Sequence, residues 1–103
     1  MKDKHGMQTE ALRQAEESLY EAIVSLRDET ECRNFFQDLC TPAELQALVD
    51  RWAVVGLLRQ GLTYRDINQR TGVSVTTIGR VARFLAEGYG GYRTVADRLR
   101  PRS

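Results

Sequence analysis

Three observations predict that this sequence folds as an all-α protein. Ala, Leu, Arg and Glu are abundant among the 103 residues, and there are only two prolines. No segment alternates apolar and polar residues as a half-buried strand would. Three segments with helical spacing of apolar residues begin directly after Thr41, Thr63 and Ser74, whose hydroxyls are good helix caps. Several short helices and no sheet explain this pattern.

The length is that of one small domain, whose core would be modest in a monomer, so association is a natural way to bury more surface. We expect a disordered, polar tail over residues 1–8, which contains the lone histidine His5. Residues 9–99 are expected to form a single helical domain. Its expected parts are dimerisation and core helices at 9–60, a helix-turn-helix at 61–87 and a terminal helix at 92–99.

Two amphipathic helices are expected in the N-terminal part. The first runs from about Thr9 to Leu26, with apolar residues at intervals of three and four. The second begins after Asp28 or Thr30 and carries Phe35, Phe36 and Leu39. Both helices have an apolar face that needs a partner surface, which either a second chain or the later helices of the same chain would provide.

The next helix has the clearest start in the sequence. Thr41 is the cap, Pro42 occupies the first helical position and Glu44 stands three residues after the cap. The helix runs to about Arg59 and ends at Gly61, with apolar residues around most of its circumference. Such a helix is expected at the centre of the core.

The segment from Gly61 to Leu85 is typical of a helix-turn-helix. Thr63 caps a first short helix, Gly72 allows the left-handed conformation that ends it, and Ser74 caps a second helix. One face of the second helix is apolar, with Ile78, Val81, Ala82 and Leu85. The opposite face has small and basic side chains suited to the DNA major groove, on Val75, Thr76, Gly79, Arg80 and Arg83. An ordinary pair of surface helices is the alternative.

The net charge of +1 conceals a polarity along the chain. Residues 1–40 carry five Lys or Arg against nine Asp or Glu, a net charge of −4. Residues 41–103 carry ten Arg against five acidic residues, a net charge of +5. The C-terminal part is therefore the candidate for nucleic-acid binding, with a merely solvated basic face as the alternative.

Other classes of function find little support in the sequence. No run of about 18 apolar residues could span a membrane, and the N-terminus lacks a signal-peptide layout, so we expect a cytoplasmic protein with no membrane partner. Cys32 and Cys40 lack a second cysteine pair or a nearby histidine, so neither a metal site nor a disulfide is expected. No nucleophile with a base and no phosphate loop is evident, so we expect no catalytic residues and no enzyme activity.

Residues from about 39 to 99 resemble the Trp repressor family, in particular its YerC/YecD-like branch. The resemblance rests on LCTPAELQAL, on Arg51, on LLRQGLTYRDINQRTGVSVTTIGRVARFL, and on the following GYGGY and VADRL. It implies a Trp-repressor-like helical homodimer in which the N-terminal helices interlock and two DNA-reading heads project.

The resemblance also implies particular DNA contacts. Arg65 coincides with an arginine of the family's first DNA-head helix that reaches DNA, and Val75 and Thr76 fall at the base-facing start of the recognition helix. Asn68 either contacts DNA or packs beside the turn, and Gly79 either permits a close approach to DNA or is merely tolerated in the helix. The candidate DNA-binding residues are Arg65, Asn68, Ser74, Val75, Thr76, Gly79, Arg80 and Arg83.

A small-molecule effector is a further question raised by the resemblance. In the Trp repressor an aromatic amino acid lies against arginines at the positions of Arg51 and Arg80, and the position of Thr41 belongs to the opposite subunit's wall. Here Val81 and Phe84 replace small residues, and we expect their bulk to fill the ligand volume. We therefore expect no cofactor and no tight binding of tryptophan. Arg51 then either contacts a ligand or forms an ion pair at the dimer seam.

These observations predict a sequence-specific transcriptional regulator that binds double-stranded DNA as a homodimer and acts as a repressor. The alternative is a helical protein-interaction module that keeps this fold without reading DNA. The arginine-rich C-terminal half favours the first, because an acidic or uncharged recognition helix would have favoured the second.

Overall fold

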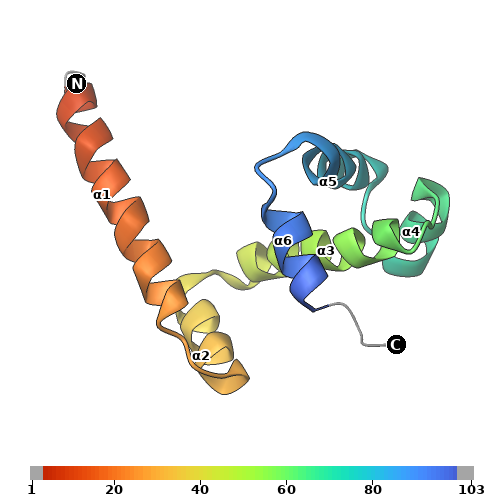
Figure 1. The fold of residues 1–103 in the computed structure, drawn as a ribbon, viewed down its shortest axis with the longest axis horizontal. Helices are drawn as coiled ribbons and strands as arrows, with labels where there is room; N and C mark the ends of the chain where they lie inside the picture. Colours follow the sequence, from red (N-terminus) through yellow and green to blue (C-terminus); the bar gives the residue numbers. More distant parts are fainter. Residues whose placement is uncertain (1–3, 100–103) are drawn as a thin grey trace. The chain divides into compact units, whose positions relative to one another are not determined.

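The computed structural model describes residues 4–99 as six α-helices, with no strand in that span. The chain divides into two compact units at the Thr41–Pro42 boundary, inside the span 9–99 that we expected to be one domain. The helices of the two units, labelled in Figure 1, are α1 (Lys4–Val24) and α2 (Glu29–Leu39), then α3 (Pro42–Arg59), α4 (Tyr64–Thr71), α5 (Val75–Glu87) and α6 (Gly91–Arg98). The all-α class predicted from the sequence is confirmed.

The first helix begins and ends earlier than the sequence indicated. We expected an irregular tail over residues 1–8, but the chain is already helical at Lys4, while residues 1–3 lie outside the described part. The sequence before the expected start contains one glycine and no proline, so the helix extends through it at a cost of only about 1 kcal/mol. At the other end α1 stops at Val24, which leaves Leu26 in the connection to α2.

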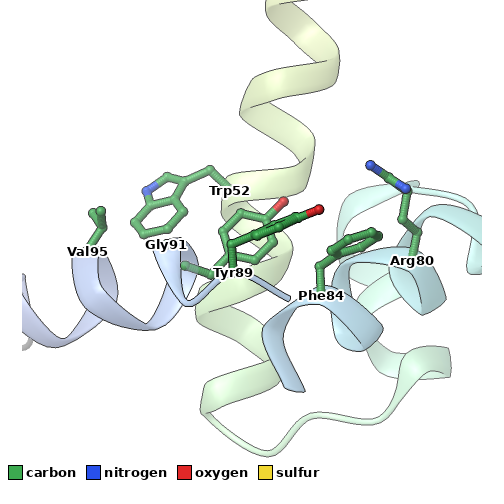
Figure 2. Close-up of a pocket in the computed structure, with 7 residues that line it drawn as sticks. Trp52, Arg80, Phe84, Tyr89, Gly91 and Val95 are labelled. Carbon is green, nitrogen blue, oxygen red and sulfur yellow. The ribbon is translucent and has the colours of Figure 1, made fainter. Parts of the chain in front are cut away.

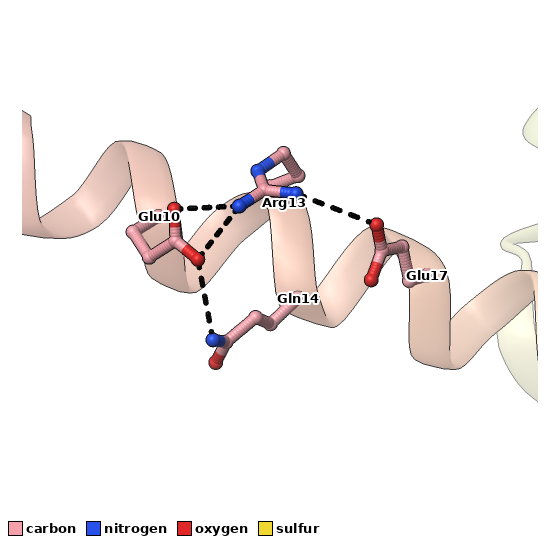
Figure 3. Close-up of polar contacts among 4 residues, drawn as sticks. All are labelled: Glu10, Arg13, Gln14 and Glu17. Atoms are coloured by element: carbon pink, nitrogen blue, oxygen red, sulfur yellow. Dashed lines mark hydrogen bonds and ion pairs between the residues drawn. The ribbon is translucent and has the colours of Figure 1, made fainter.

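A small polar network on α1 links side chains one turn apart (Figure 3). The Nη2 atom of Arg13 lies 2.8 Å from both carboxylate oxygens of Glu10, and its Nη1 atom lies 3.6 Å from Glu17. Gln14 donates a further hydrogen bond of 3.3 Å to Glu10. Exposed pairs of this kind contribute about 0.2 to 0.5 kcal/mol each, so they stabilise α1 locally but only weakly.

The second helix begins directly after Asp28, one of the two starts considered from the sequence. The Asp28 carboxylate accepts a hydrogen bond of 2.9 Å from the backbone N–H of Glu31. Within α2 the rings of Phe35 and Phe36 contact each other edge to face, with centroids 5.5 Å apart. Both rings remain half-buried, so α2 does not bury its aromatic side chains within one chain.

The N-terminal unit has no buried core of its own. Among residues 8–41, whose side chains the structure describes, none is fully buried. Val24 is 83% exposed, Leu12 66% and Leu39 50%. Burying a large apolar side chain contributes about 1.5 to 3 kcal/mol, and these residues forgo most of that contribution. The unit therefore needs a further surface to become stable.

The core of the C-terminal unit lies where α3, α4 and α5 meet. Its buried side chains are Val54 and Val55 of α3, Ile67 of α4, Val73 of the turn between α4 and α5, and Ile78 and Val81 of α5. Leu57, Leu58, Leu62 and Leu85 pack around them. Each fully buried aliphatic side chain stabilises the fold by about 1.5 to 3 kcal/mol, so this cluster fixes α5 on the other two helices.

The helix α3 is the central helix of this unit, as the sequence predicted, and it contacts α4, α5 and α6. Only its C-terminal half is buried, through Val54 and Val55. Before this buried pair, the helix leaves Leu48 40% exposed, Val49 52% and Trp52 40%. This apolar face is a second surface that the unit does not cover by itself.

Polar contacts join both ends of the last helix, α6, to neighbouring helices. In Figure 1, α6 lies across α3. Arg59 of α3 forms an ion pair with Asp97 of α6, with Nη2 and Oδ1 2.6 Å apart, and Arg93 donates a 3.0 Å hydrogen bond to the carbonyl oxygen of Leu85. The helix runs over Gly91–Arg98, close to the span 92–99 predicted for it.

Candidate nucleic-acid interface

Two short helices, α4 and α5, are joined by a tight turn whose capping residues are those predicted. The Thr63 hydroxyl accepts a 3.1 Å hydrogen bond from the N–H of Asp66, and the Ser74 hydroxyl accepts one of 3.1 Å from the N–H of Thr77. Gly72 ends α4 in the left-handed conformation, with φ of 75°. A residue with a Cβ would be strained there, so the turn requires glycine.

Three further side chains fasten the turn to α4 and to the core. The Asn68 amide donates a 2.9 Å hydrogen bond to the carbonyl oxygen of Val73. The Thr71 hydroxyl donates to the carbonyl of Ile67 at 2.7 Å and accepts from the N–H of Val73 at 3.0 Å. Val73 itself is only 7% exposed. The angle between α4 and α5 is therefore held by both hydrogen bonds and packing.

Asn68 and Ser74 thus take part in building the turn. The Asn68 side chain is half-buried and bonded to Val73, which agrees with the alternative that it packs beside the turn. Ser74 is exposed, but its hydroxyl is engaged at the N-terminus of α5. Among the candidate DNA-binding residues, these two help to position α5, which carries all the others except Arg65.

The remaining candidates form an exposed, basic surface at the start of α4 and along α5. Arg65, Val75, Thr76, Arg80 and Arg83 are all exposed, and Val75 is 53% so. Within residues 4–99 the three arginines form no ion pair with a carboxylate. The sequence from 67 to 86 contains no acidic residue, so nothing on α5 before Glu87 offsets the positive charge.

Gly79 lies on the side of α5 that faces the start of α4. A Cβ built there would lie 3.9 Å from Cε2 of Tyr64, an ordinary van der Waals distance. Local packing therefore does not require glycine at this position. Tyr64 is 42% exposed and stands next to Arg65, so it borders the same surface. Sequence reasoning missed Tyr64, although its place beside Arg65 at the start of α4 was a usable signal.

The guanidinium groups of Arg80 and Arg83 both lie near the ring of Phe84. The Cζ atom of Arg80 is 4.5 Å from the ring centroid and that of Arg83 is 5.5 Å from it. Such cation–π contacts contribute about 0.5 to 1 kcal/mol at exposed sites. Phe84 was considered from the sequence only as a possible obstruction, because a contact with neighbouring arginines depends on rotamers that spacing does not specify.

An aromatic hollow adjoins this surface between α3, α5 and α6 (Figure 2). It has a volume of about 560 Å³ and is lined by Trp52, Arg80, Phe84, Tyr89, Gly91, Tyr92 and Val95. Two of the lining rings, those of Trp52 and Tyr92, are neighbours, with centroids 6.4 Å apart. In the sequence, the aromatic residues of the segment after α5 indicated that aromatic side chains gather here. No spacing pattern in the sequence showed that they would lie near Trp52.

The two bulky residues that we expected to fill a ligand volume are placed differently from each other. Val81 is 1% exposed and belongs to the core under α5. Phe84, by contrast, lines the hollow, and the guanidinium groups of Arg80 and Arg83 lie against its ring. Whether Phe84 excludes a ligand stays a prediction, which the titration with tryptophan tests.

The three residues considered for ligand binding are placed differently from one another. Arg80 lines the hollow, whereas Arg51 is half-buried on α3 and is not part of the lining. Within residues 4–99 Arg51 forms no ion pair, and the ion pair considered for it at a dimer seam stays a prediction. Thr41 ends the N-terminal unit, while both arginines belong to the C-terminal unit.

Three further properties of the described residues concern membrane-spanning helices, metal-binding groups and cysteines. No helix there is long and apolar enough to cross a membrane. No group of three or more His, Cys, Asp or Glu residues is placed to hold a metal ion in that part of the chain. Cys32 and Cys40 are free thiols.

Solved structures define the class of this fold. A TrpR like protein from Eubacterium eligens ATCC 27750 matches with a TM-score of 0.80 and 46% identity, over 84% of this chain and 89% of that one. A crystallised protein from Staphylococcus aureus matches with a TM-score of 0.82 and 41% identity, over 93% of this chain and 97% of that one. The molecule is an all-α protein with a Trp-repressor-like fold.

Sequence comparison gives the same result. The sequence matches the Trp repressor protein family over residues 14–100. It is also 44% identical over 95 residues to YerC of Bacillus subtilis (strain 168), an uncharacterized protein, with 91% of each chain covered. The chain belongs to the Trp repressor family, as its sequence motifs indicated.

Proposed function

We propose that this protein is a homodimeric, sequence-specific DNA-binding regulator that represses transcription. Membership of the Trp repressor family suggests a DNA-binding regulator. The observation that carries the proposal is the exposed surface formed by Arg65, Arg80 and Arg83. These arginines have no carboxylate partner within residues 4–99. They lie on two helices, α4 and α5, whose connecting turn is held by hydrogen bonds. Unpaired arginines on a rigid support are suited to phosphate and guanine.

The proposed contacts divide by position on the helices. In helix-turn-helix proteins the N-terminal residues of the second helix reach base edges in the major groove. Val75 and Thr76 occupy that position, and an exposed valine there can contact a thymine methyl group. Arg80 and Arg83 lie one and two turns further along, where contacts to phosphate are expected. Arg65 reaches either a phosphate or a base edge from the start of α4.

A homodimer is supported by the apolar surface that one chain leaves exposed. The N-terminal unit contains no fully buried residue among residues 8–41, and α3 exposes Val49 and Trp52 before its buried pair of valines. A second chain would cover such faces and would supply a second DNA-reading head. Two heads are what a roughly palindromic operator requires, and occupancy of that operator would block the polymerase.

The alternative, a protein-interaction module without DNA binding, also accounts for the exposed apolar faces. It gives no reason for exposed arginines on α4 and α5 without a carboxylate partner within residues 4–99, nor for the lack of any acidic residue from 67 to 86. Whether the purified protein retains specific DNA fragments distinguishes the two functions directly.

Selection of bound fragments from a pool of random double-stranded DNA tests the proposal. We expect enrichment of a roughly palindromic sequence. The Arg65→Ala protein should bind the selected site about 1 to 3 kcal/mol more weakly if Arg65 reads a base, and should bind all sequences more weakly by a similar amount if it contacts phosphate. Arg27→Ala is a matched control, because it removes the same charge from the N-terminal unit. No enrichment from the pool would refute the proposal.

A further inference from the structure

The ring of Phe84 contacts two exposed guanidinium groups, which belong to the surface that we propose binds DNA. The Cζ atoms of Arg80 and Arg83 lie 4.5 and 5.5 Å from its centroid, within the range of cation–π attraction. Figure 2 shows Phe84 and Arg80 side by side on α5. Phe84 is half-buried and lines the hollow beside α5.

The kind of contact decides what the arginines can still do. An ion pair would occupy the N–H donors of a guanidinium, whereas contact with a ring uses its flat face and leaves the five edge donors free. Within residues 4–99 neither Arg80 nor Arg83 has a carboxylate partner. Both side chains are thus held near the surface with their phosphate-binding groups available.

Holding an arginine in advance strengthens its later contacts. A free, exposed arginine loses rotamer entropy when a ligand fixes it, and that loss is subtracted from the affinity. A side chain already stacked on a ring loses less. Arg80 and Arg83 are one and two turns beyond the start of α5, on the face opposite the core, so both benefit from the same ring.

We propose that Phe84 is a positioning residue for DNA binding, which orders Arg80 and Arg83 before DNA arrives. The proposal rests on the proposed function, since it assigns Phe84 a role in the same surface. A simpler role, as one apolar wall of the hollow, would be served equally well by leucine. The two roles therefore differ in whether an aromatic ring is required.

The first measurement needs no DNA. In the free protein, NMR relaxation of the arginine Nε–Hε groups should show Arg80 more ordered than Arg27, an exposed arginine with no ring contact among the described residues. Phe84→Leu should remove that difference and Phe84→Tyr should keep it. If Arg80 is equally mobile in the wild-type and Phe84→Leu proteins, the ordering role is wrong.

The second measurement is affinity for a mixed-sequence duplex of about 25 base pairs, long enough for two half-sites one helical turn apart. Phe84→Leu should bind about threefold to tenfold more weakly, and Phe84→Tyr should bind as the wild type does. In a protein that already carries Arg80→Ala and Arg83→Ala, Phe84→Leu should have no further effect.

A loss of affinity that persists in the arginine-free background, or an equal loss for Phe84→Tyr, would mean that Phe84 acts through the fold and would overturn the proposal. Thermal unfolding of each variant identifies such a general loss independently. If the wild-type protein binds no DNA, the proposed function fails, and the NMR comparison still decides whether Phe84 orders the two arginines.

Discussion

Gly88 and Gly91 lie three residues apart where α5 gives way to α6, yet their surroundings differ. A Cβ at Gly88 would collide with the carbonyl oxygen of Phe84 and would lie 3.0 Å from its Cδ1 atom. A Cβ at Gly91 would meet nothing within 4 Å, and its φ is not positive. The first position needs glycine for want of space, whereas the second does not.

We therefore predict that Gly88→Ala lowers the free energy of unfolding by about 1 to 3 kcal/mol, because the end of α5 must move away from the added methyl group. Gly91→Ala should change it by less than about 0.5 kcal/mol in the destabilising direction and can raise it slightly, since alanine restricts the unfolded chain. Urea denaturation measures both. Equal effects of the two substitutions would contradict the packing at Gly88.

Arg80 is the residue at which a small ligand and DNA would meet, because it lines the hollow and also lies on the basic surface. Of the two arginines considered for a ligand, Arg51 does not line the hollow. We expect no saturable binding of tryptophan at micromolar concentration in a calorimetric titration. A tenfold rise in DNA affinity on adding tryptophan, a coupling of about 1.4 kcal/mol, would show that this expectation is wrong.

At the scale of elements, the angle between α4 and α5 depends on side chains of the turn. Asn68 is the main polar one, since its amide donates to the carbonyl oxygen of Val73. We predict that Asn68→Ala lowers the free energy of unfolding by about 1 kcal/mol, the usual contribution of such a hydrogen bond. Gln69→Ala, at an exposed neighbouring position, should leave stability unchanged.

Chemical denaturation distinguishes the two roles considered for Asn68. A variant with full stability but weaker DNA binding would assign Asn68 to the interface and not to the turn.

Helix ends were predictable where a residue type forces them. Thr63, Gly72 and Ser74 have side chains or backbone freedom that act within one turn of the chain, so their roles followed from sequence. The start of α1 at Lys4 was missed because no residue there forces or forbids a helix. The orientation of Phe84 was missed because it depends on how side chains pack in the folded unit.

At the scale of the whole molecule, one chain leaves too much apolar surface in water. Val24, Leu12 and Leu39 of the N-terminal unit are at least half exposed, and so is Val49 on α3. The sequence indicated these faces through their periodicity, but periodicity does not say which surface covers them. Either a second chain or the same one would satisfy the pattern.

We predict an obligate homodimer. Sedimentation at micromolar concentration should give about twice the chain mass of 11.7 kDa, and the unfolding temperature should rise with protein concentration because dissociation accompanies unfolding. A stable, fully folded monomer with an unfolding temperature independent of concentration would contradict the dimer.

The most direct test of DNA binding by α4 and α5 is the salt dependence of affinity for a selected duplex. Each phosphate that an arginine neutralises releases counterions, so log K should fall linearly with log salt concentration. The fall should be less steep for the Arg80→Ala, Arg83→Ala protein, by about 0.9 in slope for each phosphate that the variant no longer neutralises. An affinity that does not change with salt, or a slope identical in wild type and variant, would contradict the proposal that this surface binds DNA.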